Sequence, residues 1–126
     1  MSAPAKLGFI GVGDMGAPIA RRLLRAGFAL TVHDTNPDAA ARLAASGAQV
    51  AGSAREVASA APIVFACLPS PAISERVALG DDGVAHGTAV RQYIEMSTIG
   101  APAMERIDAG LRARGIALLD APVSGG

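Results

Sequence analysis

The sequence has only one cysteine, no net charge and no long hydrophobic run, and each of these features excludes a class of protein. Cys67 alone cannot form an internal disulfide, and its place in the apolar run 63–68 predicts a buried, inert thiol. The 11 lysine and arginine residues balance 11 aspartate and glutamate residues, so we expect no nucleic acid and no anionic membrane as a partner. The longest apolar stretches are only as long as a strand, so no membrane span is expected.

Histidine and lysine are scarce as well. The two histidines, His33 and His86, are far apart and have no cysteine or acidic residue at ligand spacing, so we predict no metal site. His86 falls in the turn-rich loop 81–87. Lys6 is the only lysine, and the N-terminus carries too little positive charge for a secretory signal, which favours the cytoplasm.

The residues that are present indicate an α/β protein, because strand-like apolar runs alternate with stretches of helical periodicity. Strands are expected at 6–10, 29–33, 49–51, 63–68, 92–96 and 116–119. Helices are expected at about 14–26 and 37–43, briefly after 53, from near 71, and at about 102–114. Of the 126 residues, 51% are hydrophobic, and this composition suits strands that are covered on both faces. The alternation predicts one domain, 1–126, built on a Rossmann-type doubly wound parallel sheet.

Two of these helices have recognisable start signals. Asn36-Pro37-Asp38 is typical of an N-cap, a proline in the first turn and an acid that complements the helix dipole. Ser53 and Glu56 have the spacing of a capping box. Both signals place a helix start directly after a strand, as the alternation requires.

The segment Gly11-Val12-Gly13-Asp14-Met15-Gly16 follows the first strand and opens the first helix. In this context Gly11 allows a tight turn, Gly13 allows the backbone to approach a pyrophosphate, and Gly16 allows the helix to pack closely on the sheet. The helix start directs unpaired N–H groups and a positive dipole end at the phosphates. The segment therefore predicts a dinucleotide-binding turn.

Asp34 supplies the acid that such a turn requires. It ends the second strand, 18 residues after Gly16, where a carboxylate can accept hydrogen bonds from both adenosine ribose hydroxyls and would repel a 2′-phosphate. NAD is therefore favoured over NADP. The alternative is that Asp34 only caps the turn before Asn36-Pro37. Its neighbour His33 could flank the adenosine, but we expect an exposed side chain without a partner.

Three further segments end at the same edge of the predicted sheet, where ligands bind in folds of this kind. They are 68–70, 97–100 and 120–126. Ser124-Gly125-Gly126 can present a hydroxyl and closely spaced backbone N–H groups to a carboxylate. The alternative for this last segment is a flexible, glycine-rich end.

Four segments occur in an order and at intervals that together resemble the β-hydroxyacid dehydrogenase family. They are 8–20 (GFIGVGDMGAPIA), 67–69 (CLP), 95–99 (EMSTI) and 120–126 (DAPVSGG). The family includes 3-hydroxyisobutyrate dehydrogenase and tartronate semialdehyde reductase and is related to 6-phosphogluconate dehydrogenase. The resemblance implies that the glycine turn and Asp34 hold the adenine half of NAD, that Leu68 and Pro69 line its passage, and that Thr98 lies near the nicotinamide. Ser124, Gly125 and Gly126 would bind the carboxylate of a small hydroxyacid or semialdehyde.

One departure from the family limits what this chain is expected to do. Family members are longer and use a lysine on a later helix as general acid or base, whereas Lys6 precedes the first strand at the opposite edge of the sheet. The resemblance thus implies an oxidoreductase cofactor domain without a catalytic residue of its own and without the helical domain, and the isolated chain is expected to be inactive but to self-associate. The alternative is a non-catalytic NAD-binding or interaction module.

Overall fold

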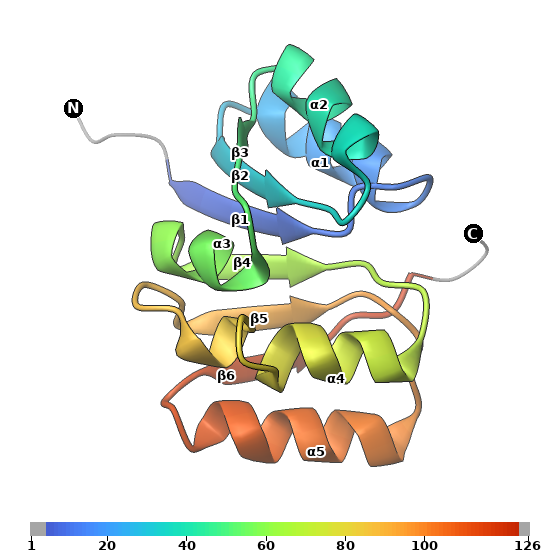
Figure 1. Cartoon of the computed structure of the whole chain (residues 1–126), viewed down its shortest axis with the longest axis vertical. Helices are drawn as coiled ribbons and strands as arrows, with labels where there is room; N and C mark the ends of the chain where they lie inside the picture. The colour runs from blue at the N-terminus through green and yellow to red at the C-terminus, as the bar shows by residue number, and fades with distance from the viewer. Residues whose placement is uncertain (1–4, 124–126) are drawn as a thin grey trace.

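The computed structural model describes residues 5–123 and contains one six-stranded sheet (Figure 1). Its strands are β1 (Lys6–Ile10), β2 (Ala29–His33), β3 (Gln49–Val50), β4 (Ile63–Ala66), β5 (Gln92–Glu95) and β6 (Ala117–Asp120). The spatial order is β3-β2-β1-β4-β5-β6, and every neighbouring pair is parallel. The predicted doubly wound Rossmann-type sheet is confirmed. The chain order reverses between β1 and β4, which is where such sheets bind ligands.

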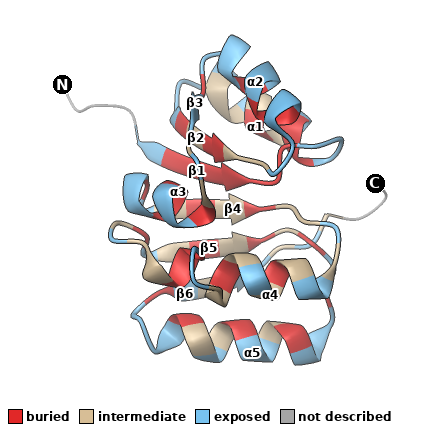
Figure 2. Cartoon of the chain, viewed as in Figure 1, coloured by how far each residue is buried: buried red, intermediate tan, exposed pale blue. Residues whose placement is uncertain are grey.

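Within residues 5–123, five α-helices pack on the two faces of this sheet. They are α1 (Gly16–Arg25), α2 (Pro37–Ala45), α3 (Ala54–Ala60), α4 (Pro71–Leu79) and α5 (Ala101–Arg112). One core, which includes Phe9, Val32 and Leu43, lies under α1 and α2. The other core, which includes Val64 and Tyr93, lies under α3, α4 and α5. Figure 2 shows the buried residues along the sheet and on the helix surfaces that face it.

Side-chain caps hold three of the helix starts. Asn36 Oδ1 accepts a hydrogen bond from the Asp38 amide at 3.0 Å, as the sequence predicts for α2. At α3, Ser53 Oγ accepts from the Glu56 amide at 3.1 Å, whereas the Glu56 carboxylate accepts from Gly52 instead of Ser53. In a standard capping box the carboxylate would accept from the amide of the N-cap residue, Ser53, whereas here it accepts from the residue before the N-cap. Ser70 caps α4 in the same way as Ser53 caps α3.

A short 3-10 helix, η1 (Val84–His86), replaces part of the predicted turn-rich loop. Val84 and Ala85 are buried in the core beside α3. No local helix signal marks these three residues, and their conformation depends on this packing. Within residues 5–123, none of the helices is long and apolar enough to cross a membrane.

The register of the sheet aligns the carboxyl ends of five strands. His33, Ile10, Ala66, Glu95 and Asp120 are successive cross-strand partners at the ends of β2, β1, β4, β5 and β6. The loops that follow these residues consequently begin along one edge of the sheet. This alignment brings together segments that are far apart in the sequence.

Candidate cofactor site

A cleft of about 940 Å³ opens at this edge, over the point where the strand order reverses. Its walls come from the glycine turn after β1, the end of β2, the turn before α3, the end of β4 and one side of α4. Of the predicted cofactor residues, it is lined by Gly11, Gly13, Asp14, Met15, Gly16, Asp34, Leu68 and Pro69. The cleft is large enough for an extended ligand that crosses several strand ends.

The glycine turn has the geometry that the motif predicts. Gly11 has φ of +89°, and a Cβ there would collide with the carbonyl oxygen of Cys67. A Cβ on Gly16 would collide with the Gly11 carbonyl oxygen, so only glycine allows α1 to start so close to the turn. A Cβ on Gly13 would meet no atom within 4 Å, so its backbone faces open space in the cleft. No side chain caps the start of α1.

Asp34 connects the end of β2 to the glycine turn. Its Oδ2 accepts a hydrogen bond from the Val12 amide at 2.9 Å, and its Oδ1 accepts from the Asn36 amide at 2.8 Å. Val12 is itself buried and contributes this N–H from behind the cleft wall. Each carboxylate oxygen retains a further acceptor position for a ligand hydroxyl. Asp34 thus accepts from the turn residue Asn36 and also lines the cleft.

His33 is half-buried and has a partner, so the expectation of an exposed, unpartnered side chain is wrong. Its Nδ1 lies 3.0 Å from the carbonyl oxygen of Ala51, with the Nδ1-protonated tautomer as donor. The Ala51 amide donates to the Val32 carbonyl, which draws the segment after β3 alongside β2. This pairing depends on strand order, which the local sequence does not encode.

Cys67 begins the loop after β4 and lines the cleft beside Leu68. It is half-buried, whereas the sequence predicts a buried residue. Burial raises the pKa of the thiol, and the nearby Glu95 raises it further. The thiol therefore stays protonated near neutral pH, as an inert cysteine requires.

One part of the predicted site does not line this cleft, and another is outside the described residues. Thr98 is exposed in the loop after β5 and does not line this cleft. Ser124, Gly125 and Gly126 lie outside the described residues. The segment that leads to them runs beside the β5 loop, because the Val123 amide donates to the Met96 carbonyl at 3.1 Å.

A buried carboxyl near this edge was missed by sequence reasoning. Glu95 ends β5 with no exposed surface, and its Oε2 accepts from the Ser97 amide at 3.4 Å. Ser97 Oγ in turn accepts from the Leu68 amide at 2.6 Å. Burial raises the pKa of Glu95 and the nearby Asp120 raises it further, although the neighbouring Ser97 and Ser74 lower it. The available signal was an acid within the apolar stretch Tyr93–Met96.

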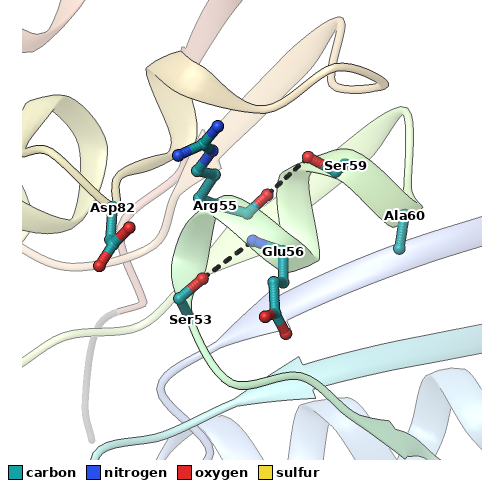
Figure 3. Close-up of a pocket in the computed structure, with 6 residues that line it drawn as sticks. All are labelled: Ser53, Arg55, Glu56, Ser59, Ala60 and Asp82. Atoms are coloured by element: carbon teal, nitrogen blue, oxygen red, sulfur yellow. Dashed lines mark hydrogen bonds between the residues drawn. The ribbon is translucent and has the colours of Figure 1, made fainter.

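A second hollow, of about 380 Å³, lies on the surface around α3 (Figure 3). The two dashed hydrogen bonds in Figure 3 join Ser53 to Glu56 and Ser59 to Arg55, so they stabilise the helix itself. This hollow adjoins the cleft, since Ser53 and Asp82 line both. Among residues 5–123, no cluster of His, Cys, Asp and Glu is arranged to hold a metal ion.

Comparison with known proteins identifies relatives over nearly the whole chain. The family profile described as the NAD binding domain of 6-phosphogluconate dehydrogenase matches residues 6–126. The chain is 45% identical over 125 residues to the NAD-dependent L-serine dehydrogenase of Pseudomonas aeruginosa, covering 96% of this chain and 41% of the relative. It is 40% identical over 121 residues to the 3-hydroxyisobutyrate dehydrogenase of that organism, covering 95% and 41%.

A solved structure is also similar over nearly the whole of this chain. The structure of Mycobacterium tuberculosis 3-hydroxyisobutyrate dehydrogenase with L-serine superposes with a TM-score of 0.89 at 34% identity, covering 98% of this chain and 42% of that one. The chain thus spans about two fifths of the length of the relatives that it matches.

Proposed function

The chain belongs to the family of the NAD-binding domain of 6-phosphogluconate dehydrogenase, and from this premise we propose that its cleft holds NAD for an oxidoreductase acting on a small β-hydroxyacid or semialdehyde. The observation that carries the proposal is the open backbone at Gly13, between an uncapped helix start and Asp34. Bound NAD would supply or accept the hydride. The residues of this chain would bind and orient it.

The adenosine half belongs at the end of β2. The Asp34 carboxylate is held by the amides of Val12 and Asn36, so it is already oriented before a ligand arrives. Its remaining acceptor positions suit the two ribose hydroxyls, and its charge disfavours a 2′-phosphate there. NAD is therefore the preferred form over NADP.

The pyrophosphate belongs at the glycine turn. The open space at Gly13 allows close approach of two phosphates to the backbone, and the start of α1 offers N–H groups that no side chain occupies. Asp14 and Met15 continue the same wall of the cleft. The electrostatic field of the helix favours an anion at this position.

The nicotinamide belongs at the end of β4, where Leu68 and Pro69 line the cleft. Thr98 lies in the loop after the next strand, β5, and Ser124, Gly125 and Gly126 are proposed to bind the substrate carboxylate. We assign no catalytic residue within this chain. Lys6 begins β1 at the amino end of the sheet, opposite the cleft, so the general acid of the reaction is proposed to come from a helical domain outside residues 1–126.

Calorimetric titration of NAD into the chain and into Gly13→Val tests the site directly. The substitution fills the space proposed for the phosphates without meeting any atom within 4 Å at Cβ, so the fold should be retained. We expect NAD to bind the unmodified chain and to bind Gly13→Val at least about tenfold more weakly, a loss of about 1.4 kcal/mol. Ala45→Val, at an exposed position of α2, is the control. Equal affinities for all three proteins would refute the proposed site.

A further inference from the structure

The proposed cofactor role leaves the buried carboxyl at the end of β5 unused. Glu95 has no exposed surface and Ser97 is 7% exposed, although both are polar. Glu95 Oε1 has no hydrogen-bond partner within residues 5–123. Burying a carboxyl that has an unpaired oxygen costs free energy. We therefore expect neighbouring groups either to depend on this carboxyl or to offset the cost of its burial.

Ser97 connects the loops that follow β4 and β5. Its Oγ accepts from the Leu68 amide at 2.6 Å, across 29 residues of sequence. The Ser97 amide donates to Glu95 Oε2 at 3.4 Å, so the buried carboxyl fixes the backbone of this serine. The Ser97 hydroxyl is then placed to accept from the Leu68 amide. The carboxyl thus orients the serine, and the serine holds Leu68.

The hydrogen bond from the Leu68 amide to Ser97 Oγ holds the short segment between β4 and α4, which has few other hydrogen bonds. The Cys67 amide donates to the Ile10 carbonyl, which is the last ladder bond of β4. Pro69 has no N–H, and Ser70 Oγ accepts from the Ile73 amide as the cap of α4. Between the strand and the helix, the Leu68 amide is held by a side chain from another loop, Ser97.

We propose that Glu95 and Ser97 are positioning residues that fix Leu68 and Pro69 at the nicotinamide end of the cleft. This inference rests on the proposed function, because it assumes that NAD lies along the cleft with its nicotinamide at β4. Neither side chain touches the ligand. Both act through the Leu68 amide, so their loss should affect one end of the ligand and not the other.

Comparing the binding of NAD with that of ADP-ribose isolates the contribution of the nicotinamide end. ADP-ribose keeps the adenosine, the pyrophosphate and a ribose but has no nicotinamide. We expect Ser97→Ala to weaken NAD binding about tenfold, the upper effect of losing one hydrogen bond, and to leave ADP-ribose binding within about twofold. Glu95→Leu should act like Ser97→Ala. Glu95→Gln, which keeps an acceptor for the Ser97 amide, should restore most of the NAD affinity.

Ser59→Ala is the matched control. Ser59 Oγ accepts from the Thr88 amide and also connects segments 29 residues apart, but it lies outside the cleft. The Ser59→Ala substitution should change neither the affinity for NAD nor the affinity for ADP-ribose. A fall of equal size for NAD and ADP-ribose in Ser97→Ala, or no fall in either, would overturn the inference. If the unmodified chain bound neither ligand, the proposed function would be wrong and the inference with it.

A second measurement decides the case if Ser97→Ala does not fold. In the unmodified protein, the amide resonance of Leu68 in a ¹⁵N-labelled sample should shift on adding NAD and should stay nearly unchanged on adding ADP-ribose. Ser97→Thr, which keeps a hydroxyl, should show the same contrast. Identical shifts with the two ligands would exclude a positioning role at the nicotinamide end.

Discussion

At the scale of single residues, Asp34 should decide the choice between NAD and NADP. Two unit charges about 4 Å apart repel by about 4 kcal/mol at an effective dielectric near 20, and solvent in an open cleft reduces this to roughly 1–3 kcal/mol. NAD should therefore bind roughly ten to a hundred times more tightly than NADP. Asp34→Ser, which removes the charge and keeps a hydroxyl, should erase most of this difference, mainly by improving NADP binding.

Calorimetry with both cofactors measures this preference. Asp38→Asn is a suitable control, because Asp38 is an exposed acid in the first turn of α2 and does not line the cleft. It removes one negative charge near the same end of β2 and should leave the preference unchanged. Equal affinities of the unmodified chain for NAD and NADP would show that Asp34 serves the turn alone.

Glu95 should make stability depend on pH. Burial raises its pKa above the usual 4.5, as does Asp120, and both Cys67, after β4, and Tyr93, on β5, lie near it. Above pH 4.5 the unfolded chain loses this proton while the folded chain keeps it. The contribution of Glu95 to the free energy of unfolding is therefore fully present below pH 4.5 and is lost as pH rises through the raised pKa.

The neutral variant Glu95→Gln should remove this dependence. In urea unfolding we expect it to be more stable than the unmodified chain at pH 8, with the difference shrinking towards pH 4. Glu105→Gln, exposed on α5, controls for the loss of one negative charge. A stability difference that is the same at pH 4 and pH 8 would contradict a raised pKa of Glu95.

The residues that the sequence identified and those that it missed differ in the range of their contacts. The roles of Gly11 and Gly16 follow from backbone conformation and close packing within one turn, so a short motif predicts them. The contacts of Ser97 and His33 reach segments that follow neighbouring strands, and their partners emerge only when the strand order is known. Local sequence alone does not carry that information.

At the scale of elements, local signals located most boundaries and tertiary contacts set the rest. β1 and β2 have the expected bounds, because glycine turns and apolar runs delimit them. β4 ends at Ala66, two residues before the expected end, since the Leu68 amide leaves the ladder for Ser97. η1 was missed for the same kind of reason, because its residues are held by packing against α3.

At the scale of the whole molecule, one part of the sheet surface is incompletely covered. α1 and α2 contact β1, β2 and β3 on their face of the sheet. On the same face, the larger apolar side chains of β4, of β5 with the residue that follows it, and of β6 are Ile63, Phe65, Ile94, Met96 and Leu119, which we term the open half-face. The first four are half-buried and Leu119 is 46% exposed. The alternation of strands and helices predicted two covered faces and did not reveal this gap.

The open half-face should make the chain self-associate, because contiguous apolar surface on a soluble protein tends to be covered by a partner. β6 is also an edge strand, which leaves a row of backbone groups beside this surface. Sedimentation at increasing concentration should therefore detect dimers or larger species.

Leu119→Lys should shift the equilibrium towards monomer, since a charge in the contact would have to be desolvated. Val50→Lys, at a position 52% exposed on the opposite edge strand β3, should leave association unchanged. A chain that stays strictly monomeric at high concentration, or two lysine variants that behave alike, would show that this surface makes no contact between copies.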